Sequence, residues 1–308
     1  MEKAAEQLTQ SLAEGGFKST ILSTHRLADL KADFERLYEQ GTFDNTFYND
    51  RLSYYTFDIP EDFSEAQSII LIAAPQPKVK VTFEYSGTPY VTIVPPTYSY
   101  DTDKIALKSI LQTLHTFGYR TRDPVLPVKS LAVRSGLASY GRNNMAYIGE
   151  WGSYFRLKAF LSDMPHAEDH WQNYCVMDRC NTCVACVKKC PTGAMSSERF
   201  VFHGEKCITY LNEGSNPFPA WVDPAWHNCL IGCMICQDVC PMNRHFVTWT
   251  IEDGEFSEDE TSMILRGVPS TELPAVTREK LNTLDLLEEY ESLGRNLRVL
   301  INGPQEEA

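Results

Sequence analysis

Apolar positions in the first part of the chain follow helical and strand periodicities in turn. A charged, amphipathic segment at residues 1–17 predicts a first helix, and a spacing of three or four residues predicts a second one that Gly41 is placed to end. The apolar run at residues 68–74 predicts a short buried strand. The residues expected on one face of the second helix are Leu27, Leu30, Phe34, Leu37 and Tyr38.

A hairpin and a third helix follow. Residues 79–85 alternate apolar and polar side chains, Ser86 and Gly87 have turn chemistry, and residues 90–94 supply a second strand. Beyond Pro95 and Pro96, residues 105–117 have helical spacing, with acidic residues at the start and Gly118 near the end. The apolar positions of that helix are Ile105, Leu107, Ile110, Leu111, Leu114 and Phe117. Alternating helices and strands predict a mixed α/β layer fold.

Composition and charge narrow the class of protein. The chain has 308 residues, 43% hydrophobic and 22% charged, which is typical of a globular protein of two domains or one large domain with an insert. Its 28 basic and 41 acidic residues give a net charge of −13, which argues against a broad nucleic-acid footprint. The first residues contain no apolar signal core, and no apolar run approaches the roughly 20 residues of a membrane helix, so we expect a cytoplasmic protein without membrane contact.

The cysteines are confined to one segment. None of the ten precedes Cys175 and none follows Cys240. In a reducing cytosol they are expected to be thiols or metal ligands, because structural disulfides are rare there. Classical dinucleotide and phosphate-binding glycine motifs are absent from the sequence.

The cysteine spacing is that of a bacterial ferredoxin. Cys180, Cys183, Cys186 and Cys190, followed by Pro191, form a C-x2-C-x2-C-x3-C-P run, in which the fourth cysteine usually ligates a second cluster. A partner run should therefore exist.

That partner run is incomplete by one residue. Cys233, Cys236 and Cys240, followed by Pro241, supply three ligands, and either Cys229 or Cys207 must supply the fourth. Zinc sites usually use cysteine pairs separated by a dozen or more residues, and disulfides do not suit the compartment. Two [4Fe–4S] clusters are the interpretation that the spacing favours.

The segments around these cysteines resemble a known family. GLASYGRNNMAYIGEWGSYFRLKAFLSDM at residues 136–164, CNTCVACVKKCPTGAM, KCITYLN and NCLIGCMICQDVCPMNR are together similar to the epoxyqueuosine reductases and, more distantly, to the reductive dehalogenases. The resemblance is close over residues 136–244 and faint before them.

The resemblance implies a fold and a domain order. It implies a nitroreductase-like α/β sandwich domain at residues 1–170 that binds a corrinoid or a flavin, followed by a bacterial two-[4Fe–4S] ferredoxin-like module at residues 171–250. For residues 251–308 we expect an acidic linker and a C-terminal helical segment that packs on the core. Two runs of acidic residues, 252–255 and 258–260, are interpreted as a solvated linker.

The resemblance also implies a ligand assignment. Family members have a ligand cysteine in an R-C-I-S-Y-L-like segment, which matches residues 206–211 here and selects Cys207. Cys175 and Cys229 are then non-ligands. One cluster would be held by Cys180, Cys183, Cys186 and Cys240, and the other by Cys190, Cys207, Cys233 and Cys236.

Candidate cofactor contacts come from the loop that begins at Gly136. The resemblance implies corrinoid contacts at Gly136, Gly141, Arg142 and Asn143, with Arg142 in the place of a family lysine. Two glycines would allow a flat macrocycle to approach the backbone closely. Tyr140 is a candidate proton donor, with an ordinary half-buried aromatic as the alternative.

A second proton donor is expected at Asp123. Epoxyqueuosine reductases have an acidic donor about fourteen residues before the glycine that matches Gly136, and that offset falls on Arg122, one position from Asp123. Asp123 before Pro124 is also ordinary turn chemistry.

Two departures argue against tRNA as the substrate. Relatives that act on tRNA carry a basic stretch before the helix at 105–117, whereas residues 97–101 contain no basic side chain, and the chain ends where a helical-repeat extension would begin. The net charge of −13 points the same way.

The overall prediction is an iron–sulfur oxidoreductase. Electrons would pass from a ferredoxin- or flavodoxin-type donor through two [4Fe–4S] clusters to a bound cobalamin, which reduces a small molecule or another corrinoid. The alternatives are a protein that reduces the corrinoid of another enzyme, a reductase that uses FMN, and an electron carrier without catalysis.

Overall fold

The structure is a computed structural model that describes residues 2–98, 101–166 and 170–303. The chain forms two compact units. The first contains residues 1–75, 101–184 and 199–202, and the second contains residues 76–100, 185–198 and 203–308. Packing therefore divides the chain differently from the functional boundaries near residues 170 and 250, which stay a prediction. Ser99 and Tyr100, in the segment without basic residues, lie outside the described residues.

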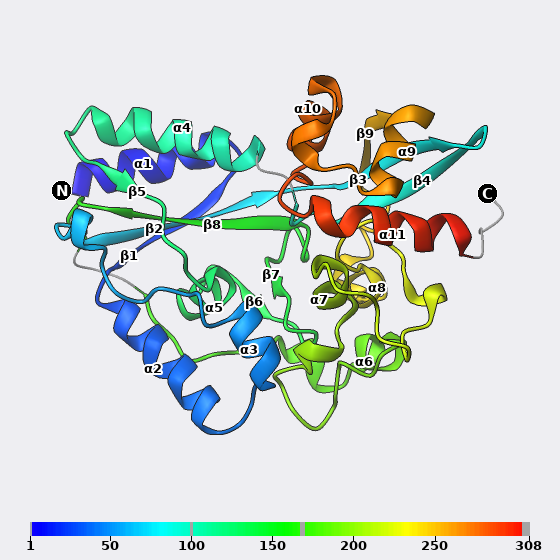
Figure 1. The fold of residues 1–308 in the computed structure, drawn as a ribbon. Coiled ribbons are helices and arrows are strands. Elements are labelled where there is room, and N and C mark those ends of the chain that lie inside the picture. Colours follow the sequence, from blue (N-terminus) through cyan, green and yellow to red (C-terminus); the bar gives the residue numbers. More distant parts are fainter. Residues whose placement is uncertain (1, 99–100, 167–169, 304–308) are drawn as a thin grey trace. The chain divides into compact units, whose positions relative to one another are not determined.

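An antiparallel sheet forms the centre of the first unit (Figure 1). Its strand order is β1-β2-β8-β5, and each neighbouring pair is antiparallel. The strands are β1 (Lys18–Ser23), β2 (Ser68–Pro75), β8 (Phe155–Ser162) and β5 (Thr121–Arg122). The predicted buried strand at 68–74 is thus confirmed as a central strand of this sheet.

Helices cover both faces of that sheet, which explains why β2 is apolar throughout. Ile70 and Ile72 face α1 (Glu2–Glu14) and α4 (Asp101–His115), which lie side by side in Figure 1. Ile69 and Leu71 face the core that includes α2 (Arg26–Glu39) and α5 (Val128–Arg134). Successive strand residues point to opposite faces, so a strand covered on both sides is apolar at every position.

The predicted helix at 105–117 forms, but its buried face differs from the expected one. Ala106, Ile110 and Leu114 are buried at a spacing of four residues. Ile105 and Leu111 are 60% and 46% exposed. Ala106 belongs to the face that packs against α1. Its small side chain allows α4 and α1 to approach closely.

Shorter elements complete the first unit. They are α3 (Asn45–Arg51) and the two-stranded pair β6 (Ser139–Tyr140) and β7 (Ala146–Tyr147).

The second unit is built around a three-stranded sheet of order β4-β3-β9. The predicted hairpin is confirmed as β3 (Lys78–Tyr85) and β4 (Thr88–Val94), joined at Ser86 and Gly87. Both turn residues have positive φ, 53° and 72°, as the common two-residue hairpin turn requires. The third strand, β9 (Thr250–Phe256), runs parallel to β3.

The acidic segment is not a linker, so that interpretation is wrong. Residues 252–255 belong to β9, where Asp253 and Gly254 form an irregularity opposite Val81 in the pairing with β3. Residues 258–260 are the first turn of α9 (Glu258–Arg266), which begins with a capping box between Ser257 and Glu260. Acidic side chains favour this position because the helix dipole is positive there.

Three helices pack on this sheet in the second unit, and three short helices contain a cysteine or begin directly after one. The packing helices are α9, α10 (Ala275–Thr283) and α11 (Tyr290–Asn302). A Cβ on Gly294 would lie 2.3 Å from the Ile264 carbonyl oxygen, so only glycine allows α11 to approach α9 this closely. The short helices are α6 (Ala185–Lys189), α7 (Ile208–Glu213) and α8 (Ile235–Asp238).

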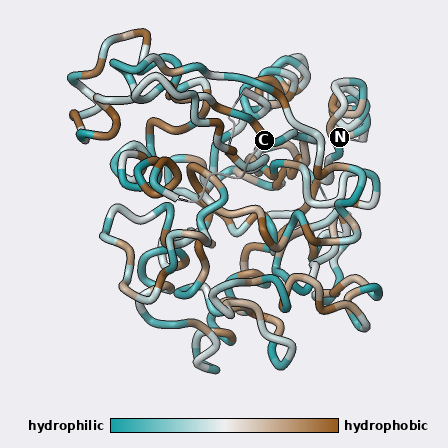
Figure 2. Tube along the Cα trace, turned by 90° about the vertical axis from the view of Figure 1, so that its right-hand side faces the viewer, coloured by the Kyte–Doolittle hydropathy of each residue, from teal (hydrophilic) through white to brown (hydrophobic). Residues whose placement is uncertain are grey.

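The mixed α/β class is confirmed. Hydrophobic and hydrophilic stretches alternate along the tube in Figure 2, as amphipathic elements require. Within the described ranges, no helix has the length and apolar character needed to cross a membrane.

Candidate metal centre

Arg142 binds the backbone of the first cysteine of the ferredoxin run. Its Nε and one terminal guanidinium nitrogen donate to the Cys180 carbonyl oxygen, at 3.2 and 2.7 Å. Both residues belong to the first unit. The planar guanidinium of arginine presents two fixed N–H donors to one acceptor. The ammonium group of lysine has no such fixed pair of donors. Arg142 therefore fixes the start of the cysteine loop.

The neighbouring residues of this loop also have partners within the first unit. Asn143 is buried, and its Nδ2 donates to the Tyr147 hydroxyl at 3.0 Å. A Cβ on Gly141 would lie 2.4 Å from Cε2 of Tyr147. Gly136, at φ 79°, ends the turn after α5, and a Cβ there would lie 2.9 Å from Cδ2 of His170. The glycines are thus explained by close packing of protein on protein.

Asn144 is a residue of this loop that the sequence analysis missed. It has φ 56°, in the left-handed region that asparagine tolerates. Its Nδ2 donates to the Phe200 carbonyl at 2.9 Å, and its Oδ1 accepts from the Phe202 backbone N–H at 2.8 Å. The two asparagines in GRNN could have indicated this role, because asparagine tolerates positive φ and its side chain forms hydrogen bonds with the backbone.

Tyr140 is a buried aromatic with a hydrogen-bonded hydroxyl. It is 8% exposed, and its hydroxyl lies 3.1 Å from Ser130 Oγ. Burial raises the pKa of Tyr140 to about 12, while the Ser130 contact acts in the opposite direction. Phe200 packs edge-on against its ring at a centroid distance of 5.2 Å. The position is consistent with the simple aromatic alternative, and its role as a proton donor stays a prediction.

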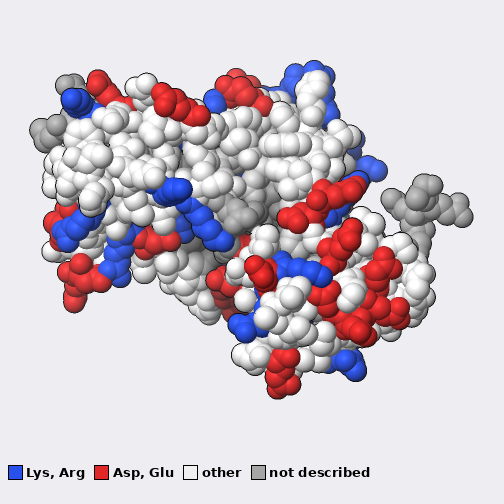
Figure 3. Space-filling view, turned by 90° about the horizontal axis from the view of Figure 1, so that it is seen from above, with Lys and Arg blue, Asp and Glu red and all other residues white. Residues whose placement is uncertain are grey.

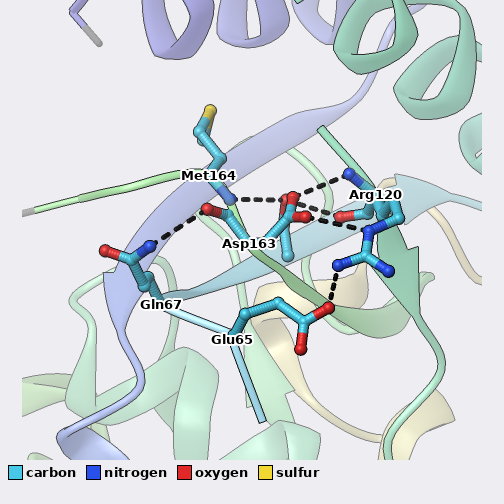
Figure 4. Close-up of polar contacts among 6 residues, drawn as sticks. Glu65, Gln67, Arg120, Asp163 and Met164 are labelled. Atoms are coloured by element: carbon cyan, nitrogen blue, oxygen red, sulfur yellow. Dashed lines mark hydrogen bonds and ion pairs between the residues drawn. The ribbon is translucent and has the colours of Figure 1, made fainter. Parts of the chain in front are cut away.

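Asp123 follows β5 and lies near the surface of the first unit. Its carboxylate pairs with Lys158 Nζ at 2.8 Å, with 58% of the Asp123 side chain exposed. A polar cluster fastens the segment before it (Figure 4): Asp163 accepts from the Arg120 backbone N–H at 2.7 Å and from Arg120 Nε at 3.1 Å, and Ser162 Oγ donates to the Arg120 carbonyl. Asp123 is therefore held in place next to a cation.

A buried ion pair lies close to Asp123 and was also missed. Arg156 Nε donates to both carboxylate oxygens of Asp103 at 3.0 Å. Burial raises the pKa of Asp103, and Arg156 opposes that shift. Asp103 also responds to the charges of Lys158 and Asp123, so the four side chains form one electrostatic group. No sequence motif predicts this ion pair, because Asp103 in α4 and Arg156 in β8 are far apart in the chain.

The eight proposed ligand cysteines divide between the two units. Cys180 and Cys183 belong to the first unit, and the other six belong to the second. The whole proposed set of Cys190, Cys207, Cys233 and Cys236 therefore lies in one unit and can be described there.

Two of these sulfurs are surrounded by hydrogen-bond donors. The Cys207 sulfur accepts from the backbone N–H groups of Thr209 and Tyr210 and from the Thr209 side chain. The Cys233 sulfur accepts from Asn228 Nδ2 at 3.2 Å and from the Ile235 backbone N–H. Such donors suit a thiolate, which is the form that binds iron. This donor set fits a [4Fe–4S] cluster.

Without iron, these thiols resist ionisation. Burial raises the pKa of Cys207 to about 11, with a further contribution from Cys233, and burial also raises the pKa of Cys233. The charge of Cys190 adds to the rise in the pKa of Cys233. Within the described residues, no three Cys, His, Asp or Glu side chains gather around one point as ligands of a single metal ion.

Cys229 has a different environment from Cys207. It is 1% exposed, and its thiol donates to Asn228 Oδ1 at 3.1 Å. Burial raises its pKa well above the ordinary value. The assignment of Cys229 as a non-ligand stays a prediction.

Comparison with known proteins supports the iron–sulfur prediction. Residues 179–243 match the family described as a 4Fe-4S double cluster binding domain. Over 122 residues, 39% of this chain, the sequence is 36% identical to an epoxyqueuosine reductase of Cellulophaga algicola, covering 38% of that protein. The epoxyqueuosine reductase of Escherichia coli K12 is 36% identical over 131 residues, 42% of this chain and 33% of its own length. The alignments thus span well under half of these curated relatives.

Solved structures extend the similarity to nearly the whole chain. An epoxyqueuosine reductase from Streptococcus thermophilus superimposes with a TM-score of 0.64 at 17% identity, over 97% of this chain and 79% of that one. One from Bacillus subtilis gives 0.64 at 20% identity, over 97% and 81%. The resemblance inferred from the sequence is confirmed. Residues 179–243 therefore form a 4Fe-4S double cluster binding domain, in a chain that has the fold of the epoxyqueuosine reductases.

Proposed function

We propose that this chain is an iron–sulfur oxidoreductase that transfers single electrons through two [4Fe–4S] clusters to a second cofactor. The observation that supports it best is the set of cysteines in residues 179–243, spaced as in a two-cluster ferredoxin and matching a double-cluster domain. One cluster would use Cys190, Cys207, Cys233 and Cys236. The other would use Cys180, Cys183, Cys186 and Cys240.

The second cofactor in this proposal is a corrinoid. When bound, it would supply a metal centre that accepts the electrons and acts on the substrate. Its proposed contacts are Gly136, Gly141, Arg142 and Asn143, but the side chains of Arg142 and Asn143 bind Cys180 and Tyr147 within the first unit. Side-chain contact with a corrinoid is therefore not supported, and the proposal rests on the family resemblance of residues 136–164.

Reduction of the substrate requires a defined number of electrons and protons. A two-electron reduction takes two successive single electrons from a donor protein of the ferredoxin or flavodoxin class, and two protons. The proposed proton donors are Asp123 and Tyr140. The Asp123 carboxylate lies 2.8 Å from Lys158 Nζ.

The substrate is proposed to be a small molecule or a second corrinoid. Relatives are named for epoxyqueuosine, and one solved relative is bound to a modified tRNA stem loop. The net charge of −13 opposes the same substrate here. On the face shown in Figure 3, Lys and Arg side chains are interspersed with Asp and Glu and form no broad basic field.

Cofactor titration is the experiment that tests the proposal. After anaerobic reconstitution with iron and sulfide, visible spectra should show two [4Fe–4S] clusters, and added hydroxocobalamin should bind while FMN should not. Binding of FMN would favour a flavin-dependent reductase. Binding of neither would favour an electron carrier, and reduction of free corrinoid without retention would favour a protein that serves another enzyme.

Transfer RNA should not bind. We expect no mobility shift with bulk tRNA at low salt, because few phosphates can be neutralised by a chain of this charge. A shift that weakens steeply as salt rises would contradict this and restore tRNA as a substrate.

A separate experiment tests Asp123 as the proton donor. Total loss of turnover in Asp123→Asn, with clusters intact, would support Asp123 as the donor, and unchanged turnover would exclude it.

A further inference from the structure

Asn228 contacts a proposed ligand sulfur directly. Its side-chain amide nitrogen, Nδ2, lies 3.2 Å from Cys233 Sγ and 3.1 Å from the Trp226 carbonyl oxygen. Both residues and Asn228 belong to the second unit, and the side chain is half-buried. Neither the ferredoxin spacing nor the donor predictions include Asn228.

The orientation of this amide is fixed by its surroundings. On its other side, Oδ1 accepts from the Met234 backbone N–H at 2.8 Å and from the Cys229 thiol at 3.1 Å. Turning the amide over would place its oxygen against the Trp226 carbonyl and the Cys233 sulfur, and its nitrogen against a backbone N–H. The favourable contacts with the Trp226 carbonyl and with the Met234 N–H would both become repulsive. The N–H group therefore points at the sulfur.

An N–H donor on a ligand sulfur changes the redox properties of a cluster. Reduction adds an electron, and the added negative charge is shared by the cysteine sulfurs. A fixed N–H dipole stabilises the more negative, reduced state more than the oxidised state, so it raises the reduction potential. Removing that donor must lower it.

We propose that Asn228 sets the reduction potential of the cluster held by Cys233, through its N–H···S bond, and that Cys229 acts as the donor that keeps the Asn228 amide in this orientation. Asn228 is thus a positioning and tuning residue. The inference rests on the proposed function, because it requires the two clusters, and it gives the otherwise unused cysteine a role.

The test is a redox titration of the reconstituted full chain, followed by electron paramagnetic resonance. In Asn228→Ala and Asn228→Asp, iron and sulfide content should stay at the wild-type level because no ligand is lost. One of the two midpoint potentials should fall, by on the order of a tenfold change in the reduction equilibrium, or about 59 mV for one electron. The other midpoint should not move. Asn228→Asp keeps an oxygen that accepts from the Met234 backbone N–H but removes the N–H donor to Cys233. It therefore separates loss of the donor from a change in the loop conformation.

A matched control adds the same charge elsewhere in the second unit. Asn302→Asp, at the exposed end of α11, should leave both midpoints unchanged. Resonance Raman spectra give a readout that a structural role would not move: the Fe–S(Cys) stretching frequency should rise in both Asn228 variants, because the sulfur no longer shares density with an N–H group.

The outcomes are distinct. A wild-type chain that cannot be reconstituted with two clusters would refute the proposed function itself. Two clusters with unchanged midpoints and Raman bands in both Asn228 variants would overturn only the tuning role. If one variant loses a cluster, the other variant still decides the question.

Discussion

Replacing Cys207 by serine is expected to remove one of the two clusters. Iron and acid-labile sulfide should fall from about eight of each per chain to about four, because each cubane needs four thiolates and a hydroxyl is a weak substitute. Hydrogen bonds from Thr209 and Tyr210 reach the Cys207 sulfur, as suits a thiolate ligand. Iron analysis and the visible absorption of the reconstituted protein measure the change.

Cys229→Ser is the matched control for this result. The substitution keeps a hydroxyl that can donate to Asn228 Oδ1, and the chain should still hold both clusters. Retention of both clusters in Cys207→Ser, with loss of one in Cys229→Ser, would reverse the assignment and make Cys229 the ligand.

Asn296→Ala is expected to destabilise the second unit strongly. Asn296 is 1% exposed, and its Nδ2 donates to the carbonyl oxygens of Asn212 and Leu230, both at 2.9 Å. These two carbonyls belong to the segments that carry Cys207 and Cys233. The variant would leave the Leu230 carbonyl without this donor, while the Asn212 carbonyl would keep the Arg295 donor at 3.2 Å. The loss should cost about 1–3 kcal/mol, which lowers the melting temperature by on the order of 5 °C. The holoprotein should also release iron faster.

Asn302→Ala provides the comparison for Asn296. Both asparagines are on α11, but Asn302 is exposed, so its removal should change the free energy of unfolding by less than about 0.5 kcal/mol. Equal melting temperatures for the two variants would show that α11 does not hold the cysteine segments together. Thermal denaturation of the holoproteins, followed by fluorescence and by cluster absorption, makes the comparison.

The two acidic runs show where local sequence reasoning failed. Residues 252–260 have the composition of a solvated segment, yet they form a bulged strand and the start of a helix. The strand forms because the preformed hairpin offers β3 as a partner and because Phe256 stacks on Phe83, with ring centroids 4.7 Å apart. Such a partner is remote in the sequence, so no local pattern contains it. The edge strand β1 was missed for the same reason.

The loop that begins at Gly136 shows a second limit. Its glycines and polar residues were predicted to meet a cofactor, and that role is still untested. In the folded chain Gly141 makes room for Tyr147, and Arg142 binds the Cys180 carbonyl. A family motif indicates that a residue matters, but the atom it contacts depends on the packing around it.

The sequence by itself determined that this protein has amphipathic helices, a buried central strand, a hairpin and a cysteine segment with the spacing of a two-cluster ferredoxin. These features depend on spacing along the chain, which periodicity and cysteine gaps record directly. Only the tertiary structure decided which side chains surround the sulfurs. Asn228 reaches Cys233 because the loop between them folds back on itself. Asn296 joins the Cys207 and Cys233 segments because folding brings together residues that are 84 and 66 positions apart.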